Sequence, residues 1–118
     1  MAKVGRLLVT GGRHGDVQVV PQRWIEDILN FDGTLAWASG DFDELFVGAD
    51  MHYRSQWYVM HGARPLIFGV GVFGQHIFVD PAADWVMAKC SSQPLPLDPT
   101  FLSMTLAGVE RLRSLGLA

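Results

Sequence analysis

The sequence predicts an α+β fold in which an antiparallel sheet of three to four strands is covered by helices. Two observations carry this prediction. Short apolar runs follow one another between residues 56 and 90 with turn residues between them, which is typical of an antiparallel meander. Apolar residues recur at helical spacing before and after this stretch, so helices are expected to cover the sheet. With 118 residues, the chain has room for a single domain.

The N-terminal region is expected to hold two short helices. The first covers residues 2–9, and Gly11 and Gly12 can end it because glycine accepts the left-handed conformation. Residues 13–20 then turn and extend, and Pro21 suits the first turn of a second helix. The second helix buries one face, which is formed by Trp24, Ile25, Ile28 and Leu29.

Residues 30–52 form the least regular part of the sequence. The segment combines glycines with acidic residues that show no paired spacing and are expected to be solvated. It also carries large apolar residues, namely Trp37, Phe42, Leu45 and Phe46. Because a long loop with aromatic residues inside a compact domain is more often functional than not, we expect it to fold over the domain or over the mouth of a cleft.

The meander is predicted to consist of strands at residues 56–60, 66–68, 76–79 and 85–90. Asp80 and Pro81 begin the turn between the last two strands, where proline fits because it need not donate to a ladder. The strand at 76–79 carries apolar residues on both faces, which predicts that both faces are covered. Three short helices offer little cover for two faces, so a partner or a further segment is expected.

The C-terminal helix has clear start and stop signals. Asp98 can cap it and Pro99 can occupy its first position. Gly116 is expected to end it. Its apolar stripe consists of Leu102, Leu106, Val109 and Leu112.

Composition argues against several classes of function. The net charge of −3, without a cluster of Lys or Arg, gives no basis for binding nucleic acid. The sequence shows no signal peptide and no membrane span, which makes the cytoplasm the default expectation. Cys90 is the one cysteine, so an internal disulfide is excluded, and its place on an apolar strand predicts burial. The four histidines lack ligand spacing, so neither a metal nor a cofactor is expected.

Three glycines stand where the strand at 76–79 begins. Gly69, Gly71 and Gly74 leave the backbone bare, and such glycines often mark a bend or the close approach of a ligand or another chain. Gly74 is equally well explained as a bulge glycine with no role in binding. Both interpretations stay open at this point.

Four pieces of the sequence, in this order, resemble one known family. They are Gly5-Arg6-Leu7-Leu8 with Gly11-Gly12-Arg13; Val19-Val20-Pro21-x-x-Trp24-Ile25; Tyr53-Arg54-x-Gln56-Trp57-Tyr58; and Gly71-x-x-Gly74-Gln75-x-Ile77-x-Val79-Asp80-Pro81 with Val86-Met87-Ala88-Lys89-x-Ser91-Ser92. They resemble the C-terminal part of serine hydrolases related to β-lactamases and penicillin-binding proteins, and most of all the branch of 6-aminohexanoate-dimer hydrolases and esterases. The resemblance implies that residues 1–118 form the C-terminal part of a larger serine hydrolase domain.

The resemblance also implies where the nucleophile lies. The family uses a serine with a lysine three residues later, and a tyrosine helps to move the proton. No serine of this sequence has such a lysine, since Lys3 and Lys89 are the only two. The serine, the lysine and the tyrosine are therefore expected upstream of Met1, and this chain alone is expected to be inactive.

Gly74 and Gln75 receive catalytic roles from the resemblance. In the family, a Lys-Thr-Gly-like triplet lines the site, and the backbone N–H after its glycine joins the oxyanion hole. The corresponding triplet here is Val72-Phe73-Gly74, and the donor is the Gln75 N–H. The apolar side chains in this triplet argue for an apolar ester or amide, or for no catalysis. Substrate contacts are expected from Gly71, Val72, Phe73, His76 and Trp57.

Two functions of different classes follow. The first is hydrolysis of a small ester or amide through an acyl-serine intermediate, once the upstream half completes the site. The alternative is a non-catalytic self-associating or binding module descended from the same fold. In both cases a homo-oligomer or a companion catalytic segment is the expected partner, because half a sheet leaves an unpaired edge. An unrelated α+β binding domain would be favoured if residues 71–75 were buried and far from any cleft.

Overall fold

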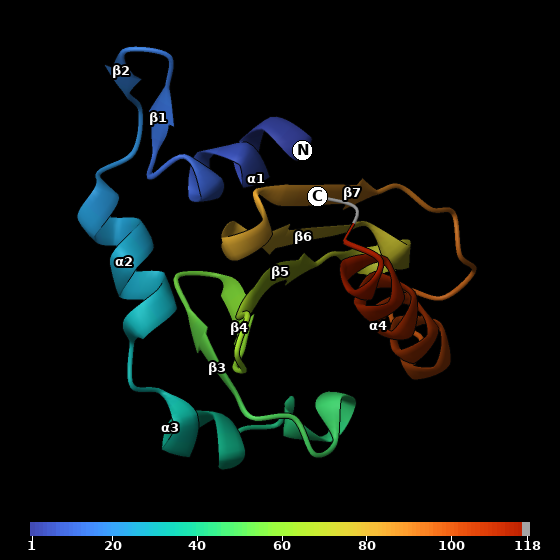
Figure 1. Cartoon of the computed structure of the whole chain (residues 1–118). Coiled ribbons are helices and arrows are strands. Elements are labelled where there is room, and N and C mark those ends of the chain that lie inside the picture. Colours follow the sequence, from blue (N-terminus) through green and yellow to red (C-terminus); the bar gives the residue numbers. More distant parts are fainter. Residues whose placement is uncertain (117–118) are drawn as a thin grey trace.

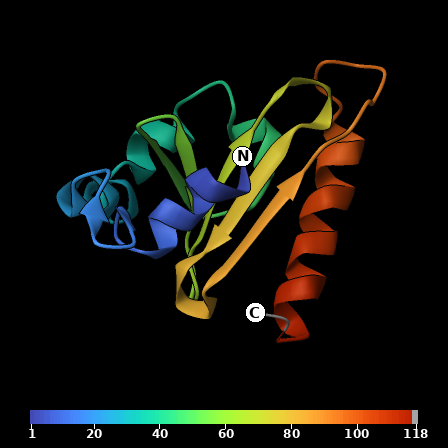
Figure 2. The same cartoon turned by 90° about the horizontal axis from the view of Figure 1, so that it is seen from above.

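The structure, a computed structural model, describes residues 1–116. Its centre is a five-stranded antiparallel sheet in the order β3-β4-β5-β6-β7, with helices on both faces (Figures 1 and 2). The strands are β3 (Met51–Arg54), β4 (Trp57–Met60), β5 (Leu66–Val70), β6 (His76–Asp80) and β7 (Trp85–Lys89). The helices are α1 (Ala2–Val9), α2 (Gln22–Asn30), α3 (Thr34–Ala38) and α4 (Pro99–Ser114), and β1 (Arg13–His14) pairs with β2 (Val17–Gln18) in a separate small hairpin. The predicted α+β class is confirmed.

The sheet has one strand more than the upper number predicted. β3 and β4 form a hairpin in which Tyr53 lies opposite Tyr58. The two residues of its turn, Ser55 and Gln56, have φ values of 51° and 68°. Such turns usually contain Asn or Gly, which accept positive φ at low cost. Because Ser-Gln is not a turn signal, the sequence predicts only one strand in this stretch.

Two separate apolar clusters cover the two faces of the sheet. On one face, Phe68 of β5 and Phe78 of β6 pack with residues of α3 and α4. On the other face, Ile67 and Val79 pack with residues of α1 and α2. Figure 2 shows α1 and α4 on opposite sides of the strands. All five residues of β6 are buried, so the prediction that both faces of this strand are covered is confirmed.

The irregular segment between α2 and β3 contains two short helical pieces. These are α3 and the 3-10 turn η1 (Asp43–Phe46). Trp37 of α3 and Phe46 of η1 are buried in the first apolar cluster, where their ring centroids lie 5.8 Å apart. The segment therefore folds over the domain, as predicted, and its aromatic residues hold it against the sheet.

Helix α4 begins and ends as its sequence predicts. The Asp98 carboxylate accepts hydrogen bonds from the backbone N–H groups of Thr100 and Phe101, at 3.0 and 3.2 Å. Pro99 is the first helical residue, and Gly116 follows the last turn with a φ of 64°. Leu102 and Val109 are the most deeply buried residues of the predicted stripe.

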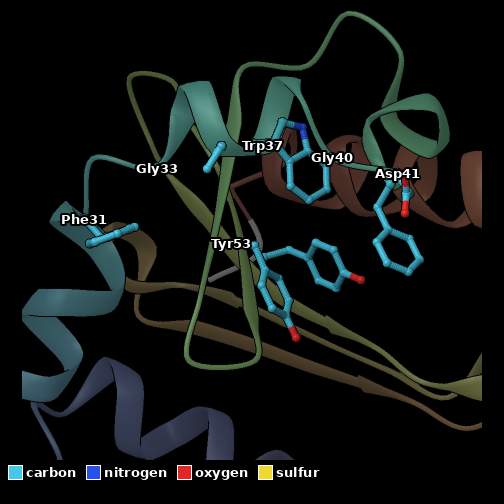
Figure 3. Close-up of a pocket in the computed structure, with 9 residues that line it drawn as sticks. Phe31, Gly33, Trp37, Gly40, Asp41 and Tyr53 are labelled. Atoms are coloured by element: carbon cyan, nitrogen blue, oxygen red, sulfur yellow. The ribbon is translucent and has the colours of Figure 1, made fainter.

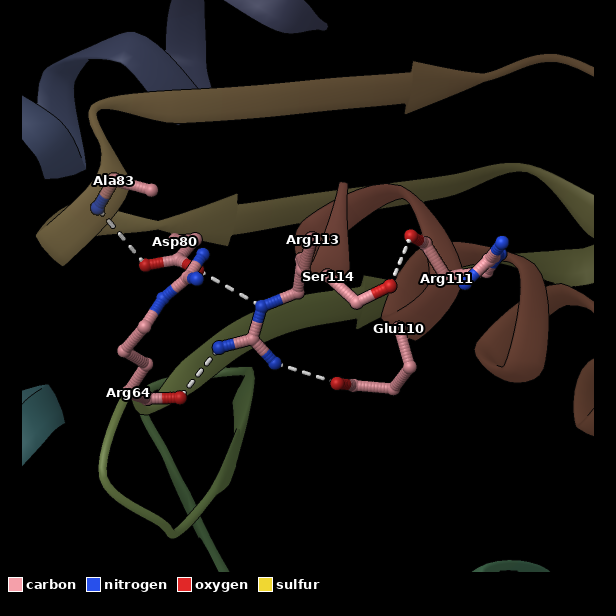
Figure 4. Close-up of polar contacts among 7 residues, drawn as sticks. All are labelled: Arg64, Asp80, Ala83, Glu110, Arg111, Arg113 and Ser114. Carbon is pink, nitrogen blue, oxygen red and sulfur yellow. Dashed lines mark hydrogen bonds and ion pairs between the residues drawn. The ribbon is translucent and has the colours of Figure 1, made fainter. Parts of the chain in front are cut away.

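A buried ion cluster joins α4 to the sheet (Figure 4). The Asp80 carboxylate is fully buried and accepts hydrogen bonds from Arg113 Nε at 2.8 Å and Arg64 Nε at 3.1 Å. It also accepts the Ala83 N–H at 3.1 Å, so its predicted role in the turn is confirmed. Burial alone raises the pKa of Asp80, but the hydrogen bonds from Arg113 and Arg64 outweigh burial and hold the pKa below its ordinary value.

Candidate functional site

The glycine-rich stretch between β5 and β6 is an exposed bend rather than a regular strand entry. Its centre is the 3-10 turn η2 (Val72–Gly74), in which Phe73 and Gly74 have φ values of 56° and 80°. The Gly71 N–H donates to the Gln75 carbonyl oxygen at 2.7 Å and closes the bend. Val72 and Phe73 are 60% and 42% exposed, so their side chains are accessible to a ligand or partner.

The backbone of Gln75 is held from two sides. Its N–H is directed to the Val72 carbonyl oxygen at 3.4 Å, which is at the weak end of hydrogen bonds. Its side-chain amide oxygen accepts the Ser91 N–H at 3.3 Å, and its amide nitrogen donates to the Ser91 carbonyl. The Gln75 N–H, to which the resemblance assigns an oxyanion role, thus lies on a fixed bend and makes only one long hydrogen bond within the described residues.

Gly74 has a packing reason to be glycine. A Cβ atom at this position would lie 2.6 Å from Gln93 Oε1 and 3.0 Å from Ser91 Cβ, both in the connector after β7. The positive φ of Gly74 adds strain for any other residue. These contacts support the structural interpretation of Gly74, and they do not require a substrate beside it.

Gly71 and Gln75 line a hollow of about 350 Å³ on the sheet. Tyr53 and Tyr58 line the same hollow. Both tyrosines also line a second cavity of about 390 Å³, which we call the aromatic pocket (Figure 3). The aromatic pocket is lined by Phe31, Gly33, Ala36, Trp37, Gly40, Asp41, Phe42, Tyr53 and Tyr58. Two adjoining hollows that share two tyrosines therefore form the candidate site.

Tyr58 occupies the centre of the candidate site. Its ring lies 4.8 Å from that of Tyr53, 5.8 Å from that of Trp37 and 5.3 Å from that of Phe68, measured between ring centroids. Burial, with a contribution from Tyr53, raises the pKa of the Tyr58 hydroxyl. This hydroxyl therefore stays protonated at neutral pH and can donate a hydrogen bond.

Two predicted substrate contacts lie elsewhere. Trp57 packs against the second apolar cluster, on the opposite side of β4 from Tyr58. His76 is 3% exposed and faces the protein interior rather than a cleft. Its Nδ1 atom is buried without a hydrogen-bond partner among the described residues. Burial, and secondarily Lys89, lowers the pKa of His76.

The prediction that Cys90 is buried is wrong. Cys90 is exposed, and so is Ala88 two residues earlier in β7, so this face of the strand is not covered near its end. Lys89 itself turns back to the bend, where its ammonium group donates to the Gly74 carbonyl at 3.1 Å. Lys89, the last residue of β7, and Ser91, in the connector after it, thus both hold the bend at residues 71–75.

Sequence analysis missed a pair of histidines. His52 Nδ1 lies 2.6 Å from His61 Nε2, and His52 Nε2 lies 2.6 Å from the Ile28 carbonyl oxygen. His61 Nδ1 lies 3.2 Å from Asp50. Asp50 directly precedes β3, His52 lies near its start and His61 directly follows β4, and the hairpin register brings them together. The sequence could not reveal this pair, because the two histidines meet only if residues 55 and 56 form the turn between β3 and β4.

Two searches of the described part of the chain bear on the candidate site. Within residues 1–116, no group of three or more His, Cys, Asp or Glu is arranged to hold a metal ion. None of the helices in this range is long and apolar enough to cross a membrane.

Comparisons with known proteins agree with the fold and the sequence motifs. No protein-family profile matches the chain. The chain is 33% identical over 96 residues to the 6-aminohexanoate-dimer hydrolase of Paenarthrobacter ureafaciens, a match that covers 81% of this chain and 24% of that protein. A solved structure from Bacillus anthracis, provisionally named a 6-aminohexanoate-dimer hydrolase, matches with a TM-score of 0.73 and 26% sequence identity. This match covers 97% of the present chain and 28% of the Bacillus anthracis chain. The chain thus spans about a quarter of the length of these relatives. The chain is therefore similar in sequence and structure to 6-aminohexanoate-dimer hydrolases, has a β-lactamase-like fold, and fits a C-terminal fragment of such a protein.

Proposed function

We propose that this chain forms one wall of the active site of a hydrolase that cleaves an ester or amide through an acyl-serine intermediate. The observation that carries the proposal is the exposed bend at residues 71–75, two of whose residues line a hollow that adjoins the aromatic pocket. A cavity lined by apolar rings with a few polar groups is the usual form of a small-molecule site. The names of the two relatives support hydrolysis as the activity.

The Gln75 N–H is the proposed oxyanion donor. During attack on a carbonyl, the oxygen gains negative charge, and a positioned N–H stabilises it by about 3 kcal/mol. The long bond from this N–H to the Val72 carbonyl is easily exchanged for a bond to the oxyanion. The exposed side chains beside it, Val72 and Phe73, are apolar, which favours an apolar ester or amide over a substrate with a carboxylate at this point.

The nucleophilic serine, its lysine and the proton-transferring tyrosine are proposed to come from a segment outside these 118 residues. The sequence contains no serine followed three residues later by lysine. The relatives are about four times as long as the matched region, which leaves room for such a segment. That segment belongs either to the same polypeptide or to a companion chain.

A serine-reactive fluorophosphonate tests where the nucleophile lies. Intact mass spectrometry of the 118-residue chain alone is expected to show no adduct. The same reagent, applied to material purified from the native cells through an antibody against this chain, is expected to label a longer polypeptide or a companion chain. An adduct on this chain itself would contradict the placement of the serine. No adduct in either sample would favour the non-catalytic binding module.

A pair of variants tests the oxyanion donor in the complete hydrolase. Gln75→Pro removes the N–H, and proline tolerates the observed φ of −80°. Gln75→Ala keeps the N–H and removes the side-chain bonds to Ser91, so it is the matched control. The kcat of the proline variant is expected to be about 100-fold or more below that of the alanine variant. Equal kcat values would rule out this N–H as the donor.

A further inference from the structure

The walls of the aromatic pocket have a chemical feature that the proposed hydrolysis does not use. Five aromatic rings line it, and they come from α3, β3, β4 and the segments on either side of α3 (Figure 3). Asp41 is the one charged side chain in the lining, and Figure 3 labels it next to Gly40. The pocket thus combines several π faces with a single negative charge.

The surroundings of the pocket are negative as well. Residues 31–51, which supply most of its lining, contain five carboxylates and no Lys, Arg or His. Arg54 is a cation at the edge of the pocket, and its Cζ lies 3.9 Å from the centroid of the Phe31 ring. Arg54 Nε is paired with Asp27 at 2.7 Å, so its charge is matched there. The Phe31 ring, at the edge of the pocket, is therefore already in contact with the Arg54 guanidinium, which leaves the other four rings for a ligand.

We propose that the aromatic pocket binds an organic ammonium cation with apolar substituents on nitrogen. The electron-rich faces of aromatic rings attract such a cation, and the alkyl groups on nitrogen bury apolar surface against the same rings. The volume of about 390 Å³ lies in the range of small-molecule sites. The Asp41 carboxylate matches the charge of the ligand. Tyr53 and Tyr58 line the same pocket, and their phenol hydroxyls offer hydrogen-bonding groups to polar parts of the ligand.

This inference goes beyond the proposed hydrolysis, because it concerns binding by the chain itself and needs no nucleophile. A ligand in the aromatic pocket would lie beside the hollow at Gly71 and Gln75, since the two hollows share Tyr53 and Tyr58. Binding can therefore be tested on the 118-residue chain, and the result does not depend on whether the complete protein is a hydrolase.

The first experiment compares choline with 3,3-dimethylbutan-1-ol, in which carbon replaces the charged nitrogen. Titration calorimetry is expected to show that choline binds about five- to thirtyfold more tightly than its neutral analogue, which is the range that cation–π contacts provide. NMR spectra are expected to show a choline-dependent shift of the Trp37 indole signal. Equal affinities, no binding of choline, or shifts confined to residues outside the pocket would each overturn the proposal.

Matched variants test whether the pocket is the site. Asp41→Asn is expected to weaken choline binding about three- to fivefold, and Glu44→Gln, in the same acidic segment but outside the lining, is expected to leave it unchanged. Phe42→Leu keeps apolar volume and removes a ring, so it is expected to weaken choline and spare the neutral analogue. Phe101→Leu on α4 is its control, because Phe101 is exposed and does not line this pocket. Equal effects within either pair would contradict the assignment.

Discussion

Arg113 Nε donates a hydrogen bond to Asp80 Oδ2 at 2.8 Å, and this bond joins the last turn of α4 to the end of β6. Both side chains are buried, and Arg113 also donates to the Arg64 carbonyl and to Glu110. The guanidinium thereby ties the helix to the turn before β5 as well. A single buried carboxylate is therefore the common partner of three segments of the chain.

Asp80→Asn is expected to lower the free energy of unfolding by about 3 kcal/mol, because it leaves the buried Arg113 guanidinium without its counter-ion. Urea unfolding followed by circular dichroism measures the loss. Asp84→Asn is the matched control, since Asp84 forms an exposed pair with Arg6 at 2.6 Å and such pairs contribute at most about 1 kcal/mol. Similar losses in the two variants would show that the buried cluster has no special role.

The same cluster predicts how the free energy of unfolding falls at acidic pH. The folded-state pKa of Asp80 is lowered, so the unfolded chain binds the proton first as the pH falls below about 4, the ordinary value for aspartate. The contribution is complete above that pH and is lost as the pH falls further, through the folded-state pKa. Unfolding free energies measured from pH 6 to pH 2 are expected to fall less steeply below pH 4 in Asp80→Asn than in the natural chain. Parallel curves would contradict this prediction.

The lowered pKa of His76 leads us to expect a second pH dependence of the free energy of unfolding, at higher pH than that of Asp80. The folded-state pKa of His76 is lowered, mainly by burial, so the unfolded chain takes up the proton first below about pH 6.5. Stability from this group is complete above that pH and is lost as the pH falls through the lowered value. His76→Gln is expected to reduce the slope of unfolding free energy against pH in this range. His14→Gln, which changes an exposed histidine, controls for the number of histidines.

Gly74→Ala is expected to destabilise the bend. Its Cβ would meet Gln93 and Ser91 in the connector, and φ at this position is 80°. Gly48→Ala is the control, because Gly48 has a similar φ of 76° and nothing within 4 Å of the added carbon. We expect the first variant to lose about 1 kcal/mol more than the second, measured by thermal or urea unfolding. If both lose the same, the contact with the connector is unimportant.

The sequence predicts α1, α2, α4 and most strands because their signals are local, whereas α3 lies in the segment expected to be irregular. Pro99 after Asp98 indicates the start of α4, and short apolar runs separated by turn residues indicate β5 to β7. The hairpin turn at Ser55 and Gln56 could not be predicted, because its positive φ values have no glycine or asparagine to announce them.

The candidate site was predicted only in part. Gly71 and Gln75 do line a hollow, as glycines at a strand entry suggest. Trp57 and His76 are not among the residues that line this hollow, because the face on which a strand residue lies depends on exact register. The aromatic pocket and the role of Asp80 in binding two arginines depend on contacts between residues far apart in sequence, which no local pattern records.

The strand order has a consequence for how the chain folds. Each strand of the five-stranded sheet pairs only with its neighbours in sequence, so every ladder can form by closing a short loop. Chains dominated by such local pairings fold quickly, because little loop entropy is lost before contacts are gained. The contact that spans the most residues is that of α1, which packs on β6 and β7 and whose Arg6 pairs with Asp84. We therefore expect the hairpins to form first and the N-terminal helix to dock onto a sheet that is already assembled.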